Sequence, residues 1–265
     1  MSLIEERNVQ FGRRGGHAQA GQAAFSTAGG GPAAIRPGLC HSPFDLHAIS
    51  IPAGSFTGDF YFTRQFDHEL WIALGDVAGK GLEAAIFMSM IHEELEARID
   101  SCSRHGCDPS TTISRLDGVL RQTLPPNRFA TAVVARLGDD GTLLISNAGH
   151  CPALLLRANG SIEELPSTGP VLGVFSTPTW RTTSTRLEKG DALFLYTDGL
   201  VEAQSADEEE LGLNCTRSVL QSLVNSSARG IAVSFRDLVV RHSQGHRYDD
   251  LTLLAARFNP SPLRG

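Results

Sequence analysis

The sequence has few cysteines and no long hydrophobic run. Its 265 residues include five cysteines, an odd number with no C-x-x-C pair, so we expect reduced thiols rather than a disulfide framework. No apolar run approaches the roughly 20 residues that cross a bilayer, and the N-terminus lacks the apolar core of a signal peptide. We therefore expect a cytoplasmic protein without a membrane partner.

Positive charge is also scarce. The chain has 23 Lys and Arg residues against 29 Asp and Glu residues, a formal net charge of -6, and no cluster of basic residues. A nucleic-acid partner would require such a cluster, so we expect none. Apolar residues make up 41% of the chain, enough for a substantial core in one large domain or two small ones.

A zinc site finds little support in the sequence. Cys102, His105 and Cys107 lie close together, but no second group of ligands completes a tetrahedral site.

Composition divides the chain into three parts. Residues 1–44 are rich in Gly and Ala and predict a disordered arm, residues 45–258 predict the folded domain, and residues 259–265 form a short tail. In the first half of the domain, "DLHAISIPAGSFTGDFYFTRQ" predicts strands around a turn and "ELWIALGD" a central strand. A helix is expected after Gly81, and a second with Asp108 as N-cap and Pro109 in its first turn.

The second half of the domain predicts mostly strands. "RFATAVVARL", "GTLLISNAGH" and "PALLLRANGS" read as an antiparallel meander with tight turns at Asp140-Gly141 and Asn159-Gly160. Two more strands, "WRTTSTRL" and "DALFLYTDG", are followed by helices near 213–224 and 232–242 and by a last strand, "DDLTLLAARF". This order indicates an α+β fold with antiparallel sheets flanked by helices.

Acidic residues recur at the ends of apolar strands. Asp76 follows "LWIALG", and acids in the same kind of position are Asp59, Asp198 and the Asp249-Asp250 pair. One such aspartate is often only a turn former. Several carboxylates in a core require a positive partner, and no Lys or Arg stands at comparable positions. Mg²⁺ or Mn²⁺ would suit these oxygen ligands, and two such ions sharing an aspartate can activate a water that attacks a phosphoryl group.

Two nucleotide-binding patterns overlap the same stretch. "GKGLEA" matches G-x-G-x-x-A between a strand and a helix, but no second strand ends in an acid about 20 residues later, and Asp100 is expected to follow the helix directly. A phosphate-binding P-loop fails because Gly75 to Gly79 is one residue too short and Gly81 replaces the required Ser or Thr.

Six motifs together resemble a known family. They occur in order between about Ala48 and Phe258, and they are "TGDFY", "LGDVAGKGLEAA", "FATAVVARL", "NAGHCPALLL", "LEKGDALFLYTDGLVEA" and "YDDLTLL". They are similar to the successive motifs of the metal-dependent protein phosphatases, the PPM or type 2C superfamily, in its bacterial SpoIIE/RsbU-like branch. The resemblance implies a β-sandwich of two antiparallel sheets, flanked by helices on both faces, with a two-metal site at one end.

The resemblance also implies roles for the acidic residues. Asp76 would bridge two Mg²⁺ or Mn²⁺ ions, with the Val77 carbonyl and Asp59 serving one ion. Asp198 and Asp249 would serve the other, although Asp250 is an alternative to Asp249. Asp76 and Asp198 would thus be the catalytic residues, with a metal-bound water as the nucleophile.

Several glycines and basic residues would support the site. Gly75, Gly79 and Gly81 would let the backbone approach the ions or simply form a tight turn. Lys80 would contact phosphate or remain solvated. Gly149-His150 matches an "AGH" motif that we interpret as structural rather than as a general base, and Gly199 follows Asp198 in its motif.

The chain departs from the superfamily at three points. Ala78 stands where the eukaryotic-type enzymes carry a histidine, and their phosphate-binding arginine has no clear counterpart, as is usual in this branch. Phe62 replaces the second acid of the branch's common "GGDFYD" motif, which we expect to change metal affinity rather than abolish binding.

The function implied is a serine/threonine protein phosphatase. By resemblance, its substrate would be an anti-anti-sigma (STAS) protein or a similar partner-switching phosphoprotein, and a separate regulatory protein is a further expected partner. Phe62 and the unassigned general acid leave a non-catalytic pseudophosphatase open. A small-molecule phosphoesterase would differ only in its substrate.

Overall fold

The computed structural model describes residues 6–7, 42–79, 81–125 and 127–260. Most of the predicted N-terminal arm, Lys80 and the end of the predicted tail lie outside the described residues. Among the described residues, no helix is both long and apolar enough to cross a bilayer.

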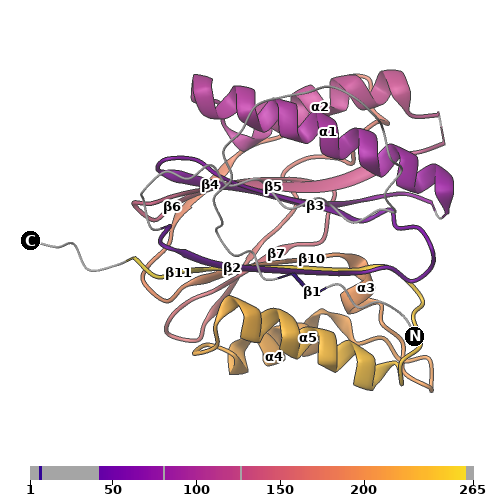
Figure 1. Ribbon diagram of the computed structural model, residues 1–265, viewed down its shortest axis with the longest axis vertical. Coiled ribbons are helices and arrows are strands. Elements are labelled where there is room, and N and C mark those ends of the chain that lie inside the picture. The colour runs from indigo at the N-terminus through magenta and orange to yellow at the C-terminus, as the bar shows by residue number, and fades with distance from the viewer. Residues whose placement is uncertain (1–5, 8–41, 80, 126, 261–265) are drawn as a thin grey trace, which may run out of the picture.

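Two antiparallel sheets lie face to face, with helices on both outer sides (Figure 1). One sheet has the strand order β1 (Glu6–Arg7), β2 (Phe44–Ile51), β11 (Leu251–Phe258), β10 (Ala192–Tyr196), β7 (Ala153–Leu156) and β8 (Ile162–Leu165). The other has the order β3 (Phe60–Gln65), β4 (Glu69–Val77), β5 (Ala130–Gly138), β6 (Thr142–Ala148) and β9 (Thr183–Arg186). The predicted α+β sandwich is confirmed.

The helices divide between the two outer faces. The β3–β9 sheet is covered by α1 (Leu82–His105) and α2 (Pro109–Thr123), and the β1–β8 sheet by α4 (Gly212–Ser222) and α5 (Ala228–His242). A one-turn helix, α3 (Asp198–Val201), follows β10 directly. Three apolar layers result, one between the sheets and one beneath each helical pair.

Strand β4 shows why a continuous apolar run suits this architecture. Leu70, Ile72 and Leu74 join the core between the sheets, whereas Trp71 and Ala73 join the core beneath α1 and α2. Because successive side chains of a strand point to opposite faces, a strand covered on both faces is apolar at nearly every position. The run therefore places the carboxylate of Asp76 where the buried part of β4 ends.

The helix signals were largely correct. The Asp108 side chain accepts a hydrogen bond from the Thr111 N–H at 3.0 Å, and Pro109 begins α2. The end of α1 was misjudged, because α1 continues to His105 and Asp100 lies inside it, where it pairs with Arg64 at 2.6 Å.

The predicted three-stranded meander was wrong. β5 and β6 pair antiparallel, but β6 and β7 belong to different sheets, and β7 pairs with β8 and β10. The chain changes sheet at Gly149, whose positive φ of 65° permits the sharp turn. The Asn147 side chain holds this corner by accepting the His150 N–H at 2.8 Å and donating to the Cys151 carbonyl at 3.0 Å.

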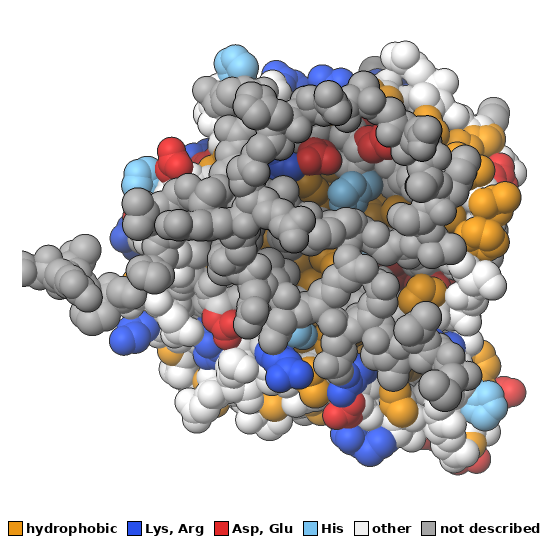
Figure 2. All heavy atoms as spheres, in the orientation of Figure 1, with side chains coloured by type: hydrophobic (Ala, Val, Ile, Leu, Met, Phe, Trp, Pro, Cys, Tyr) orange, Lys and Arg blue, Asp and Glu red, His pale blue; other side chains and the backbone are white. Residues whose placement is uncertain are grey.

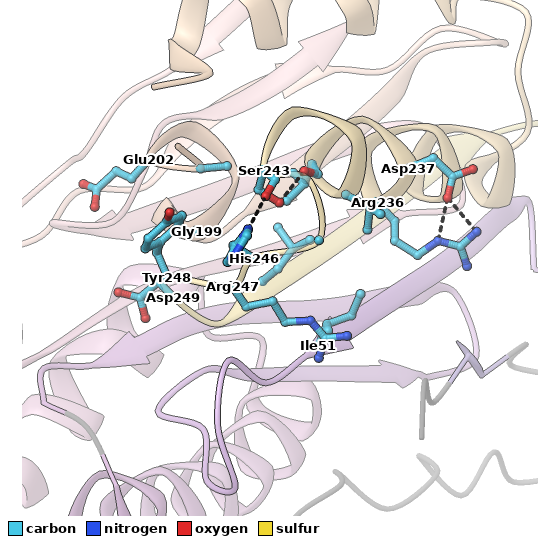
Figure 3. A pocket seen from close by; sticks show the side chains of 15 residues that line it. Ile51, Gly199, Glu202, Arg236, Asp237, Ser243, His246, Arg247, Tyr248 and Asp249 are labelled. Carbon is cyan, nitrogen blue, oxygen red and sulfur yellow. Dashed lines mark hydrogen bonds and ion pairs between the residues drawn. The ribbon is translucent and has the colours of Figure 1, made fainter. Parts of the chain in front are cut away.

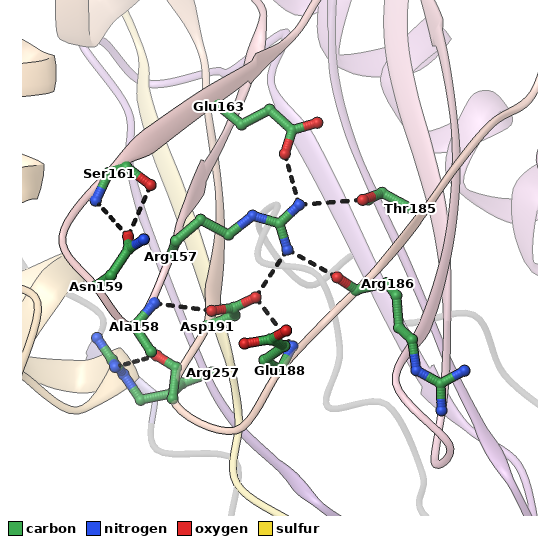
Figure 4. A network of polar contacts seen from close by, with 11 residues as sticks. Arg157, Ala158, Asn159, Ser161, Glu163, Thr185, Arg186, Glu188, Asp191 and Arg257 are labelled. Carbon is green, nitrogen blue, oxygen red and sulfur yellow. Dashed lines mark hydrogen bonds and ion pairs between the residues drawn. The ribbon is translucent and has the colours of Figure 1, made fainter.

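A polar network joins the sheets at the end of the sandwich where β10 begins (Figure 4). Arg157, just after β7, donates to buried Asp191 at 2.9 Å, to Glu163 at 2.5 Å and to the Arg186 carbonyl at 2.7 Å. Asp191 also accepts N–H groups of Ala158 and Glu188, so its charge is well compensated. We assign this network a structural role.

Candidate metal centre

The acidic residues selected from the sequence gather at the other end of the sandwich, where β4 and β10 finish. Phe60 pairs with Gly75 in the β3–β4 ladder, which places Asp59 beside Asp76. Asp198 opens α3 immediately after β10, and Asp249 and Asp250 immediately precede β11, the neighbour of β10. The two sheets therefore bring together residues nearly 200 positions apart.

The charges of these carboxylates act on one another. Burial raises the pKa of Asp76 to about 7, and the charges of Asp198, Asp249 and Asp250 add to the effect. Burial likewise raises the pKa of Asp59 well above its usual range, with Asp76 and Asp250 contributing. Hydrogen bonds from the hydroxyls of Thr252 and Thr197 oppose that rise. A concentration of buried negative charge of this kind is stabilised by a bound cation.

Two oxygens of the predicted ligand set converge above Gly58. A Cβ added to Gly58 would lie 2.8 Å from Oδ1 of Asp76 and 2.9 Å from the carbonyl oxygen of Val77. Glycine thus leaves open the space that both oxygens face. Carboxylate and carbonyl oxygens are the donors that Mg²⁺ and Mn²⁺ prefer, so the residues present fit such ions.

The carboxylates share this end of the sandwich without forming a compact ligand set. Within the described ranges, no three Asp, Glu, His or Cys side chains already form a group that could hold a metal ion. The residues Cys102, His105 and Cys107, considered above for zinc, likewise form no such group.

Asp249 and Asp250 occupy different environments. Both carboxylate oxygens of Asp250 accept backbone N–H groups, from Ala53 at 2.7 Å and from Gly58 at 3.0 Å. Asp250 thereby holds the loop of residues 52–59 against the site. Asp249 is exposed, with one oxygen accepting the Asp250 N–H at 2.9 Å. This difference favours Asp249 as the metal ligand.

Glycines let the backbone segments of the site pack closely. A Cβ on Gly199 would clash with the carbonyl oxygen of Asp250, so Gly199 allows the segments that carry Asp198 and Asp249 to touch. Gly75 lies within β4, whereas Gly79 and Gly81 have positive φ in the turn before α1.

His150 links the two sheets behind the carboxylates. Its Nε2 lies 3.1 Å from the Tyr196 carbonyl oxygen and must donate to it, so Nδ1 accepts from the Thr131 hydroxyl at 2.8 Å. Thr131 pairs with Asp76 in the β4–β5 ladder, and Tyr196 lies two residues before Asp198. Burial lowers the pKa of His150 to about 4. A neutral, fully bonded imidazole is consistent with the predicted structural role.

Replacing His150 by glutamine is expected to reduce the acid sensitivity of the fold. The neutral imidazole is favoured in the folded state, so its contribution to stability is complete above pH 6.5 and is lost as pH falls toward 4. The shift corresponds to up to about 3 kcal/mol. Urea unfolding at pH 7 and pH 5 should show a smaller loss for His150→Gln than for wild type. An equal loss of unfolding free energy in the two proteins would contradict a neutral, buried His150.

Two residues near the site were missed by the sequence analysis. Arg128 donates to the Ala78 carbonyl at 3.3 Å and pairs with Glu83 at 2.6 Å, so it fastens the turn after Asp76. Its partners are 50 and 45 positions away, and no local pattern identifies it. The second is Thr197, whose hydroxyl donates to Asp59 at 2.8 Å. Its position directly before Asp198-Gly199 is the sequence feature that could have identified it.

Phe62, which replaces the second acid of the motif, lies away from the carboxylates. It belongs with Phe60 to the core beneath α1 and α2. Its ring meets His92 of α1 edge-on at 5.8 Å between centroids. The substitution therefore serves helix packing.

Exposed apolar side chains flank the same end of the molecule. Figure 2 shows apolar side chains along the right-hand edge, where α1 begins and α3 lies in Figure 1. Large apolar residues that are 39% to 58% exposed occur on the segments bordering the site, among them Phe56, Leu82, Ile86, Phe129 and Tyr248.

Comparison with known families identifies the family of this domain. The family model described as Stage II sporulation protein E (SpoIIE) matches residues 67–259, which is most of the chain. The chain belongs to the SpoIIE family.

SpoIIE-family relatives and structures of the same fold are similar over most of the chain. Phosphoserine phosphatase RsbU of Bacillus subtilis (strain 168) is 31% identical over 219 residues, covering 80% of this chain and 63% of RsbU. The RsbU and RsbW domains of Rv1364c from Mycobacterium tuberculosis superpose with a TM-score of 0.70 at 28% identity, covering 83% of this chain and 61% of that one. RsbX in complex with magnesium, at 19% identity and a TM-score of 0.60, covers 81% of this chain and 94% of that one and shares the fold.

The similarity does not extend over whole relatives. The chain spans less than two thirds of the length of RsbU and 38% of Protein IcfG of Synechocystis sp.. The SpoIIE-family match therefore concerns the domain that carries the candidate metal centre.

Proposed function

We propose that this chain is a Mg²⁺- or Mn²⁺-dependent protein phosphatase that hydrolyses phosphoserine or phosphothreonine. The observation that carries the proposal is the gathering of Asp59, Asp76, Asp198 and Asp249 at one end of the sandwich. There, burial and then the charges of Asp198, Asp249 and Asp250 raise the pKa of Asp76 to about 7. Similarity to RsbU, named a phosphoserine phosphatase, supports the reaction class. The magnesium complex of RsbX, which has the same fold, supports the choice of metal.

Each ligating residue has a role that its position permits. Asp76 and the Val77 carbonyl would hold the ions from β4, Asp59 from the position before β3, Asp198 from the start of α3 and Asp249 from the segment before β11. When bound, two divalent cations supply Lewis acidity that activates a water molecule and neutralises phosphate charge. Thr197 orients Asp59, while Asp250 fixes the 52–59 loop. His150 joins the strand before Asp198, β10, to β5, the neighbour of β4.

The substrate that we propose is a phosphorylated protein, of the STAS anti-anti-sigma kind or a similar partner-switching component. Exposed apolar side chains on the segments around the site would suit contact with another protein better than with a small phosphate ester. Regulation by a separate protein is part of the same proposal.

Metal-dependent phosphate release tests this function. The full chain, stripped with EDTA and then supplied with Mn²⁺, is expected to release phosphate from a phosphoserine STAS domain and from p-nitrophenyl phosphate. Activity should vanish when EDTA is in excess and return when Mn²⁺ is restored. Absence of turnover with both substrates, despite Mn²⁺ binding in calorimetry, would exclude catalysis and favour the pseudophosphatase.

A further inference from the structure

A pocket of about 470 Å³ opens between α5, the segment before β11 and the end of α3 (Figure 3). The side chains of Ile51, Ala203, Val239, Val240 and Leu251 give it an apolar lining. Val240 and Tyr248 at this pocket are 49% and 53% exposed, so the pocket adjoins apolar surface that is open to solvent. Burying such surface against a partner is favourable.

The pocket and the candidate metal centre share a wall. Gly199 and Asp249 line the pocket, and Figure 3 shows them at one end of it, with the Arg236–Asp237 ion pair at the other. An extended chain advances about 3.3 Å per residue. A segment whose phosphoserine reached the carboxylates would therefore place a side chain only a few residues away over the pocket.

Charged side chains of both signs line the pocket, namely Arg236 and Arg247 together with Glu202, Asp237 and Asp249. Arg247 is exposed and donates to the Pro52 carbonyl at 3.2 Å, a contact that sets its position without neutralising its charge. Arg236, by contrast, is paired with Asp237 at 2.8 Å. Glu202 and Asp249 lie at the end next to the candidate metal centre, so a negatively charged segment that crosses the pocket would be attracted to the Arg247 side.

We propose that this pocket receives an apolar side chain located within a few residues of the phosphorylated serine or threonine of the substrate. The proposal rests on the proposed function and adds a determinant of substrate choice. Val240 and its apolar neighbours bury the side chain, Arg247 attracts the segment, and Asp249 marks the boundary with the metal centre.

A phosphoserine peptide library with randomised flanking residues tests the pocket. With Mn²⁺, wild type is expected to prefer large apolar residues at one fixed flanking position by about tenfold in kcat/KM, the effect of burying one such side chain. Val240→Trp, which fills the pocket from a half-exposed position, should abolish that preference. The preference is a ratio measured within one enzyme, so it does not depend on the variant's overall rate.

Gln221→Trp, an equally bulky change at an exposed position of α4 outside the pocket, should keep both the preference and the rate. Turnover of p-nitrophenyl phosphate separates the two proposals. If wild type hydrolyses it but shows no preference among peptides, or if Val240→Trp keeps the preference, the pocket proposal is wrong while the phosphatase proposal stands. If wild type hydrolyses neither substrate class, the phosphatase proposal fails and the pocket proposal fails with it.

Discussion

Asp76→Asn is expected to lower Mn²⁺-dependent phosphate release by at least about a thousandfold. The substitution keeps the size of the side chain but removes the charge at the centre of the carboxylate group, where Asp198, Asp249 and Asp250 all act on it. Asp67→Asn, the same change in the exposed β3–β4 turn, is the matched control and should retain wild-type activity. Wild-type turnover by Asp76→Asn would contradict the assigned role of Asp76.

The same variant should be more stable than wild type when metal is removed. Burial and neighbouring charges raise the pKa of Asp76 from 3.8 to about 7, so the unfolded chain ionises this carboxyl at a lower pH than the folded protein does. The folded state therefore loses stability as pH rises from 3.8 toward 7, and the full cost is present at pH 8. In EDTA at pH 8, we expect Asp76→Asn to unfold about 2–4 °C higher, equivalent to about 1 kcal/mol. Mn²⁺ should raise the midpoint of wild type more than that of the variant. A lower unfolding midpoint for Asp76→Asn than for wild type in EDTA would show that ionised Asp76 does not destabilise the folded protein.

Gly58→Ala is expected to weaken Mn²⁺ binding by about tenfold or more while leaving the fold intact. Its Cβ would lie 2.8 Å from Asp76 Oδ1 and 2.9 Å from the Val77 carbonyl oxygen, closer than such atoms approach. The Val77 oxygen belongs to the backbone, so the turn after β4 would have to shift. The Mn²⁺ concentration for half-maximal activity measures the effect.

Gly54 provides a matched control within the same loop. A Cβ on Gly54 meets no atom within 4 Å, and Gly54→Ala should behave as wild type in metal binding and activity. Equal behaviour of the two variants would show that the space above Gly58 does not serve a cation.

Much of the candidate site could be predicted because its residues carry local signals. Asp76 and Asp198 each stand beside a glycine at the end of an apolar strand, and strand ends on one side of a sandwich meet. Asp108 and Pro109 likewise form a cap that is complete within four residues. Such features need no knowledge of tertiary contacts.

The features that were missed depend on distant parts of the chain. The residues near Gly149 do not indicate that β7 pairs with β10 instead of β6. A turn sequence predicts that the chain reverses direction, but it does not determine which sheet the next strand joins. Arg128 hydrogen-bonds to the Ala78 carbonyl and to Glu83, which are 50 and 45 positions away in the sequence. The short strand β8, with the sequence "IEEL", has too little apolar alternation to be recognised.

The place of β11 has a consequence for how the domain folds. β11 lies between β2 and β10, and its pairing joins Leu251 to Ile51, which are 200 positions apart. The central ladder of this sheet therefore closes only after the ends of the folded region meet, a topology that favours slow and cooperative folding. An intermediate lacking β11 would also lack the Asp249 segment in place. Mn²⁺-dependent phosphate release should consequently return during refolding no sooner than β11 pairs with its neighbours.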